Sequence, residues 1–168
     1  KEILKEIENY FKILNKNKKF KALVTAGPTH EYIDPVRFIA NKSSGKQGFA
    51  LAKSLAKNGF ETTLISGPTN LKIDKNINLI EVESGDEMFK ATQDNLPVDV
   101  AIFSAAVADF KIKEKKNNKI KKHEYISLDL EKNVDILNYI SNHNSLRPKL
   151  VIGFAAETNN ILTNAKKK

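Results

Sequence analysis

The segment Ser43–Gly48 (SSGKQG) has the composition of an anion-binding turn, and it stands where a helix is predicted to begin. The first backbone N–H groups of a helix have no partners within it, and the helix dipole adds positive charge at that end. Such groups suit a phosphate. The same residues could form an ordinary helix cap, because serine is a common N-cap and glycine permits close packing. The six residues alone leave both interpretations open.

A long loop separates this segment from the strand before it. Gly27 ends an apolar strand, and seventeen residues, 28–44, follow before the next glycine. In a dinucleotide-binding fingerprint the glycines follow the first strand directly, so the spacing argues against that site. Loops of this length in compact domains are usually functional. Asp34, Arg37 and Asn41 lie within it, although Arg37 could equally form a weak surface ion pair.

Small residues dominate the segment Phe103–Asp109 (FSAAVAD), which follows an apolar strand. In doubly wound sheets ligands collect at the carboxyl ends of the strands, and small residues there let a ligand approach the backbone. Asp109 could accept a hydrogen bond from a ribose hydroxyl, or bind Mg2+, which prefers carboxylate and phosphate oxygens. Its ordinary alternatives are a helix cap or a solvated turn.

Seven lysines lie between Lys111 and Lys122, and the run Lys119–Lys122 (KIKK) begins ten residues after Asp109. A lysine run is usually solvated, and this is the favoured interpretation when the run is taken alone. Its position beyond a predicted ligand-binding edge raises the chance that one lysine meets a phosphate.

A last apolar strand, Val151–Thr158, also ends in small residues. Phe154 offers a face on which a base could stack, but an apolar residue at a strand end is more often part of the core. The histidines His30, His123 and His143 have no metal-ligand spacing, so we predict no histidine metal site.

These residues need a scaffold, and apolar periodicity predicts one. Short apolar runs alternate with helical patterns, which is typical of a parallel sheet flanked by helices. We predict strands at 21–26, 62–66, 77–82, 99–105 and 149–155, and helices at 46–58, 85–95 and 134–142. Gly59 would end the first helix, Ser84 with Glu87 would form a capping box on the second, and Asn133 would cap the third. The fold class is α/β, with a doubly wound, mostly parallel, Rossmann-like sheet.

Two segments lie outside this alternation. Residues 1–14 predict an amphipathic helix, which at this length must pack on something to be stable. Residues 106–132 predict a mobile basic loop followed by a strand, since apolar residues alternate at Ile126, Leu128 and Leu130.

Composition narrows the class of protein. The chain has 168 residues, 40% of them apolar, without a run near the roughly 20 that a membrane span needs. One soluble domain with no membrane contact is expected. Because cysteine is absent, disulfides, thiolate metal sites and cysteine nucleophiles are excluded. No secretory signal is evident, so the default compartment is the cytoplasm.

A formal net charge of +8 raises the possibility of nucleic-acid binding. The charge distribution argues against it. Much of the excess lies in short lysine clusters, above all at 111–122, and aromatic residues are not interleaved among them as a base-stacking surface requires. Small anionic ligands or solvated lysines account for the charge better.

Taken together, several ordered motifs resemble phosphopantothenoylcysteine synthetase, the ligase domain of the bacterial bifunctional decarboxylase/ligase of coenzyme A biosynthesis. The motifs are GPT at 27–29, IDPVR at 33–37, Asn41 with SSG at 43–45, AAVAD at 105–109 with KIKK at 119–122, and GFAAET at 153–158. The resemblance covers about residues 20–168. It implies a ligase that joins 4'-phosphopantothenate to L-cysteine through an acyl-nucleotide, with CTP as substrate, Mg2+ as cofactor and no flavin in this chain.

The same resemblance implies the partners and the roles of residues. It implies a homodimer without nucleic acid, in which residues 1–19 are a linker helix from an upstream flavin-dependent decarboxylase and 20–168 form the ligase domain. Asn41 would bond the reacting acyl group, Lys119 would offset phosphate charge, and Ser43, Gly45 and Gly48 would cradle phosphates. The nucleotide would be surrounded by Phe103, Ser104, Ala105, Asp109, Lys119, Val134, Asp135, Ile136, Leu137, Phe154 and Lys168, with Asp109 also as the metal ligand.

Two residues depart from the family pattern. Lys42 stands where the family often has histidine, and Val134 stands where proline often follows Asn133. The first adds a charge beside Asn41, and the second alters the turn that would face the base. Two rival functions remain: a basic nucleotide- or nucleic-acid-binding module without catalysis, and a nicotinamide-dependent oxidoreductase, which the displaced glycines disfavour.

Overall fold

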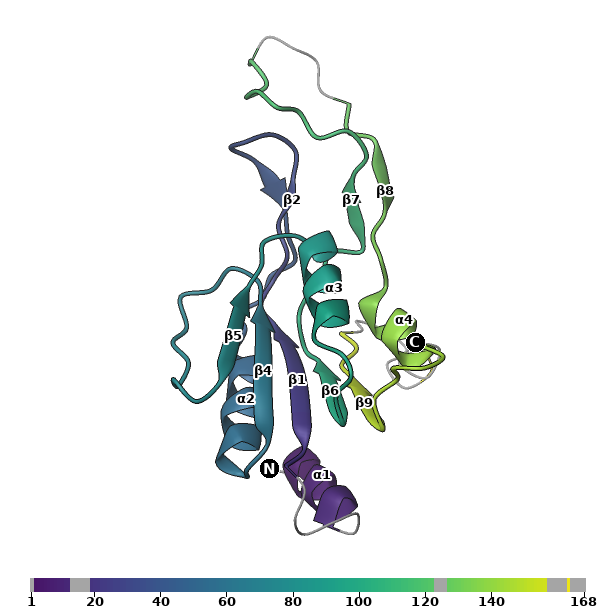
Figure 1. The fold of residues 1–168 in the computed structure, drawn as a ribbon. Coiled ribbons are helices and arrows are strands. Elements are labelled where there is room, and N and C mark those ends of the chain that lie inside the picture. The colour runs from purple at the N-terminus through teal and green to yellow at the C-terminus, as the bar shows by residue number, and fades with distance from the viewer. Residues whose placement is uncertain (1, 13–18, 123–126, 157–162, 164–168) are drawn as a thin grey trace.

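Five parallel strands form the central sheet of the chain (Figure 1), and all five agree with the predicted strands to within about two residues at each end. The computed structural model describes residues 2–12, 19–122, 127–156 and 163. The strands are β1 (Lys21–Ala26), β4 (Glu61–Ser66), β5 (Asn78–Glu81), β6 (Val100–Phe103) and β9 (Leu150–Gly153), in the spatial order β5-β4-β1-β6-β9. Counted in chain order these strands lie 3-2-1-4-5, so the order reverses between β1 and β6. Ligands bind at this switch point in doubly wound sheets.

Helices cover both faces of the sheet, which confirms the doubly wound fold. On one face α2 (Lys46–Lys57) packs in a core with Ala22 and Val24 of β1. On the other, Leu23 packs in a second core that includes Met88 of α3 (Gly85–Asp94) and buried residues of α4 (Ile136–Ser141). Alternate residues of β1 therefore enter opposite cores, as the two-residue period of a strand requires.

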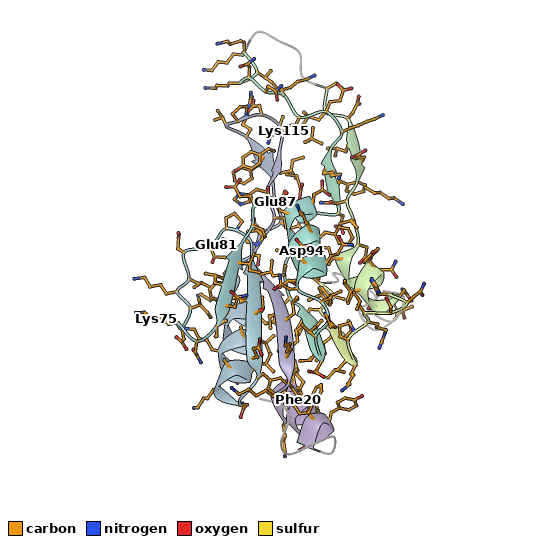
Figure 2. All side chains as sticks on the ribbon, in the orientation of Figure 1. Phe20, Lys75, Glu81, Glu87, Asp94 and Lys115 are labelled. Carbon is orange, nitrogen blue, oxygen red and sulfur yellow. The ribbon has the colours of Figure 1, made fainter. Side chains whose placement is uncertain are left out.

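The first helix, α1 (Glu2–Lys12), packs against the base of the sheet as its length required. Ile7 and Phe11 are 1% and 2% exposed. The Phe11 ring centroid lies 4.6 Å from that of Phe20 and 5.6 Å from that of Phe60. Phe20 marks the lower end of the sheet beside α1 in Figure 2. No helix among the residues described is long and apolar enough to cross a membrane.

Two of the three predictions of residues that cap the helices are confirmed. Gly59 follows α2 with φ 86°, a left-handed conformation that suits glycine. Ser84 Oγ accepts from Glu87 N at 3.2 Å, while the Glu87 carboxylate accepts from the backbone N of residue 83, one residue earlier than in the standard capping box. The predicted Asn133 cap is wrong. Asp135 caps α4 instead, accepting from Asn138 N at 2.9 Å.

Two short antiparallel hairpins extend beyond the carboxyl edge of the sheet (Figure 1). The first pairs β2 (Glu31–Tyr32) with β3 (Phe38–Ile39), and the second pairs β7 (Phe110–Ile112) with β8 (Leu130–Lys132). The predicted basic loop lies between β7 and β8. The expected strand begins only at Leu130; Leu128 precedes it, and Ile126 lies outside the described residues. We call the two hairpins together the arm.

Candidate functional site

A cavity of about 560 Å³ opens at the switch point, where β1 and β6 end. The structure brings most of the predicted nucleotide-site residues onto its wall. They are Phe103, Ala105, Asp109, Val134, Asp135, Ile136, Leu137 and Phe154, together with Asn41 and Lys42. These residues come from four separate parts of the chain, so only the fold makes them neighbours.

The alanine-rich segment after β6 is held against the end of β1. Ala106 N donates to Gly27 O at 2.8 Å, and Ala108 N donates to Thr29 Oγ1 at 3.1 Å. Ser104 is half-buried, and its backbone N donates to the carbonyl of Thr25 at 3.2 Å; it does not line the cavity with its neighbours. These bonds keep the small side chains close to the cavity wall, where a ligand can approach the backbone.

Asn41 lies at the rim of the cavity, and its side chain forms a hydrogen bond with the segment after β6. Its Nδ2 donates to Val107 O at 2.9 Å, although the side chain is exposed. An amide nitrogen carries two hydrogens and the amide oxygen two lone pairs, so one hydrogen remains for a ligand. Lys42 is exposed beside it, and its ammonium adds positive charge to the same rim.

The far wall is formed by residues 134–137 and by the end of β9. We call residues 134–137 the turn, although the last two of them already belong to the first turn of α4. Asp109 O accepts from Asn133 N at 2.8 Å, which ties this turn to the segment after β6. Gly153 packs closely beside it: a Cβ at that position would lie 2.3 Å from Leu137 Cδ2, so the Leu137 side chain would have to shift. Phe154 is 37% exposed and lines the cavity. The interpretation of Phe154 as a core residue is therefore wrong, because β9 ends before it.

The start of α2 retains the features of a phosphate cradle. Gly45 precedes the helix with φ 71°, no side chain caps the helix, and the first turn carries no acidic residue. Ser43 Oγ accepts from Gly45 N at 3.3 Å, so the serines order the turn itself. Gly45 lies close to Gly27 at the end of β1, since a Cβ on Gly45 would be 3.4 Å from Gly27 Cα. The helix start therefore adjoins the strand end that borders the cavity.

Gly48 lets α2 approach β1, and substitution by alanine should destabilise the domain. A Cβ at Gly48 would lie 2.5 Å from Ala26 Cβ and 3.1 Å from Thr25 O. Alanine is otherwise the better helix former by about 1 kcal/mol, but overpacking of this kind costs about 1–3 kcal/mol. Because the added Cβ would meet Ala26 Cβ at 2.5 Å, the cost should lie at the upper end of that range, and we expect Gly48→Ala to lower the free energy of unfolding by a net of about 2 kcal/mol in urea titrations.

The matched control is Gly59→Ala, where no atom lies within 4 Å of the added Cβ and only the positive φ opposes the change. That conformation costs about 1–2 kcal/mol. If Gly48→Ala proved as stable as the parent chain, close packing would not be the reason for glycine at this position.

Lys119 does not join Asn41 in this structure. It is exposed and lines a second hollow, of about 470 Å³, in the arm. Among the described residues, this hollow and the cavity at the switch point have no lining residue in common. Lys168, the other predicted lysine of the site, lies outside the described residues, as does His123.

A buried carboxylate anchors the basic loop next to Lys119. Asp34 is fully buried and accepts from Ile120 N at 3.2 Å, while Arg37 Nη2 donates to Ile120 O at 3.0 Å. Arg37 also binds the Asp34 carboxylate. The Arg37 guanidinium, with backbone N–H groups and against the effect of burial, holds the pKa of Asp34 well below its ordinary range. The Asp34–Arg37 pair is therefore more than a surface ion pair, because these two side chains form hydrogen bonds with both the backbone N and the backbone O of Ile120.

Charged residues also fill the space between the arm and α3. Lys111 Nζ lies 2.7 Å from the Asp86 carboxylate and 3.9 Å from that of Glu131. Hydrogen bonding to Asp86 raises the pKa of Lys111. Lys115, labelled beside the β2 hairpin in Figure 2, has its ammonium 4.9 Å from the Tyr32 ring centroid. Several lysines of the basic run thus have defined structural partners, which the charge pattern alone did not predict.

Comparison with known proteins identifies the family of this chain. Residues 17–168 match the family model of the DNA/pantothenate metabolism flavoprotein C-terminal domain. The chain is 43% identical over 169 residues to the coenzyme A biosynthesis bifunctional protein CoaBC of Haemophilus influenzae, covering 99% of this chain and 42% of that protein. It is 42% identical over 170 residues to CoaBC of Borreliella burgdorferi, covering 99% and 43%. The chain thus spans about two-fifths of the length of these relatives.

A solved structure gives the same result for the fold. The crystal structure of the C-terminal domain of the coenzyme A biosynthesis bifunctional protein CoaBC superimposes with a TM-score of 0.74 and 41% sequence identity. The match covers 89% of this chain and 70% of that domain. The five-stranded sheet is therefore a shared architecture.

Proposed function

This chain belongs to the family of the DNA/pantothenate metabolism flavoprotein C-terminal domain, and we propose that it is a CTP-dependent ligase that joins 4'-phosphopantothenate to L-cysteine in coenzyme A biosynthesis. One observation carries the proposal. The cavity at the switch point gathers Asn41 with the segments 103–109 and 134–137 and with Phe154. An amide donor, a carboxylate and an aromatic face around one cavity suit a reacting acyl group, a ribose and a base respectively.

The reaction proceeds in two displacements. A carboxylate oxygen of phosphopantothenate attacks the α-phosphorus of CTP, the bond to the bridging oxygen breaks, and pyrophosphate leaves with the electron pair. The cysteine amine then attacks the acyl carbon, CMP leaves with the carbon–oxygen electron pair, and the nitrogen loses a proton. In the first step negative charge passes from the carboxylate to the leaving pyrophosphate. In the second step it develops on the acyl oxygen, where the free Nδ2 hydrogen of Asn41 can stabilise it.

The lining residues favour one orientation of the nucleotide. Phe154 would face the base together with the turn 134–137, and Asp109 would accept from a ribose hydroxyl. The start of α2, which adjoins the cavity without lining it, would receive phosphate. Lys42 lies on the rim between Asn41 and that helix start, where its ammonium attracts the triphosphate. The departure from histidine at this position therefore adds a full positive charge beside the proposed phosphate site.

Mg2+ fits this site as a companion of the nucleotide. No group of three or more histidine, cysteine or acidic side chains that could hold a metal occurs in the part of the chain that the structure describes. Magnesium commonly binds through one or two carboxylates plus substrate phosphates, and Asp109 and Asp135 both line the cavity. When bound, the ion neutralises phosphate charge. Asp109 is its proposed ligand.

CTP should outperform ATP as the substrate. The proposal rests on the bacterial-type motifs of this chain and on a base-facing wall formed by a turn, whose backbone groups can hydrogen-bond to the edge of a small pyrimidine. We expect pyrophosphate release, with phosphopantothenate and cysteine present, to be at least about tenfold faster with CTP, a difference of roughly 1.4 kcal/mol. Reactions without phosphopantothenate give the background. Equal or faster release with ATP would contradict the assignment.

The relatives are bifunctional proteins, and we propose that residues 1–19 are the linker helix from an upstream flavin-dependent decarboxylase. By family resemblance we also propose a homodimer as the assembly and the cytoplasm as the compartment. Exposed apolar side chains on the arm, Phe38, Phe110 and Leu130, would be covered by the second copy. Light scattering of the purified chain measures the assembly directly, and a monomer at micromolar concentration would exclude the dimer.

A basic binding module without catalysis is the second candidate, favoured only by the lysines of the arm. It predicts salt-dependent binding to random RNA and no pyrophosphate release from CTP with phosphopantothenate. These two measurements separate the candidates. Three of the lysines have acidic or aromatic partners in this structure, Lys111, Lys115 and Lys116, which leaves less free charge for a nucleic acid.

A further inference from the structure

Glu31 occupies an unusual position for a glutamate, because it is 5% exposed and joins three distant segments. Its Oε1 accepts from Gly85 N at 3.0 Å and from Asn133 Nδ2 at 3.0 Å. Gly85 begins α3, whose dipole favours a negative charge at this end. The Lys111 ammonium also interacts with Glu31, and this interaction contributes to the raised pKa of Lys111. The buried carboxylate therefore has both hydrogen-bond donors and a nearby positive charge.

Asn133 connects Glu31 to the cavity. Its backbone N donates to Asp109 O at 2.8 Å, and its side-chain Oδ1 accepts from Val134 N at 2.9 Å. Asn133 lines the cavity and immediately precedes the turn 134–137 on the far wall. Thus a single residue links Glu31 outside the cavity and the base-facing turn through its side chain, and Asp109 on the opposite wall through its backbone N.

Gly85 packs closely against the hydrogen bond between Glu31 and Asn133. A Cβ at Gly85 would lie 2.5 Å from Asn133 Nδ2 and 3.1 Å from Glu31 Oε1. Only a residue without a side chain leaves room for the carboxylate and the amide to meet at the start of α3. Glu31 itself faces a separate hollow between the arm and α3, so it does not touch a ligand in the cavity.

We propose that Glu31 is a positioning residue for nucleotide binding, acting through Asn133 to set the turn 134–137 against Asp109. The inference rests on the proposed function, since it concerns the same nucleotide site. It assigns the buried glutamate a role in affinity for the base and ribose, and none in the transfer of the acyl group. Loss of the link should therefore weaken nucleotide binding while the chemical step at Asn41 proceeds.

Two single variants of the full chain test the link, with CTP binding measured by calorimetry and turnover measured as pyrophosphate release. Glu31→Ala removes the acceptor, and we expect the dissociation constant and KM for CTP to rise at least about tenfold, while kcat changes less than about threefold. Glu31→Gln keeps an acceptor oxygen at the same distance and should bind CTP within about threefold of the parent. If Glu31→Ala lowered kcat and left KM unchanged, the proposal would be overturned.

A double variant at residues 31 and 133 distinguishes loss of the specific contact from a general loss of stability. Asn133→Asp sets a second carboxylate against Glu31 and should weaken CTP binding by at least about tenfold. Adding Glu31→Gln restores a donor, because the glutamine amide can donate to the new carboxylate while its oxygen accepts from Gly85 N. We expect the double variant to recover at least about threefold of the lost affinity. If Glu31→Ala fails to fold, Asn133→Asp and the double variant test the proposal by themselves. The proposal would then be overturned if the double variant bound CTP no better than Asn133→Asp.

The parent chain separates this inference from the proposed function. If the parent binds no CTP and releases no pyrophosphate, the proposed function is wrong and the positioning role falls with it. If the parent binds CTP and Glu31→Ala binds it equally well, only the positioning role is wrong.

Discussion

Substitution of Asn41 by aspartate is expected to lower product formation by at least about a hundredfold. The change nearly preserves shape but removes the Nδ2 donor that reaches Val107 O at 2.9 Å and replaces it with a carboxylate oxygen. That oxygen would meet the Val107 carbonyl with like partial charge, and it could not donate to the acyl oxygen. Loss of one positioned donor to a developing oxyanion typically costs about 10²–10³ in rate. Pyrophosphate release and product mass measure the effect.

The control for charge is Asn70→Asp, an exposed asparagine in a loop after β4 that does not line the cavity. It adds the same negative charge to the molecule and should change turnover less than about twofold. Turnover of Asn41→Asp at the parent rate would refute the role of this amide. A large loss in both variants would indicate that net charge, and not the donor at residue 41, controls the reaction.

The strands and the cavity wall could be predicted because both depend on local patterns. Apolar runs such as Val100–Phe103 are buried on both faces, and a parallel strand covered by helices has this composition. Residues that follow such strands meet at the carboxyl edge, which is why the pattern favours a ligand site near Asp109. The assignment of Asn41 and Phe154 to the same site came from the family resemblance. The order of the strands then places that site between β1 and β6.

The arm could not be predicted in the same way. β2 contains only two residues, Glu31 and Tyr32, and two residues show no period. Glu31 is buried by partners that lie 54 and 102 residues away, so its local sequence carries no sign of them. Sequence favours Asn133 as a helix cap because asparagine often is one. Its side chain bonds to Glu31 and Val134 instead, and Asp135 takes the capping role.

The location of Lys119 is the remaining point on which the structure differs from the expectation drawn from the sequence. The family resemblance predicted Asn41 and Lys119 as the two catalytic residues, yet they line separate hollows. The basic loop is tied down on both sides of Lys119: Lys116 N donates to Ile33 O at 2.9 Å, and Ile120 is held by Asp34 and Arg37. These hydrogen bonds connect the segment around Lys119 to the loop that leads to Asn41. For Lys119 to approach the triphosphate, the two segments would have to shift together or these bonds would have to break.

Lys119→Gln is expected to lower turnover at least about tenfold, equivalent to roughly 1.4 kcal/mol of transition-state stabilisation. Glutamine keeps polarity and approximate length but removes the charge that would meet phosphate, and a charge-assisted hydrogen bond is about twice as strong as a neutral one. Arrival of the nucleotide would repay the cost of moving the loop, and the closed loop would shield the acyl-nucleotide from water. Steady-state turnover with saturating CTP is the measurement.

Lys122→Gln is the matched control, because Lys122 is an exposed lysine of the same basic run, three residues further along. It should change turnover less than about twofold. Lys115 is a poorer control, since its ammonium lies over the Tyr32 ring and its loss would disturb the arm. Equal losses in Lys119→Gln and Lys122→Gln would show that the loop supplies bulk charge. A loss confined to Lys119 requires a positioned ammonium, and the anchoring of its neighbour Ile120 by a buried carboxylate is the feature that would position it.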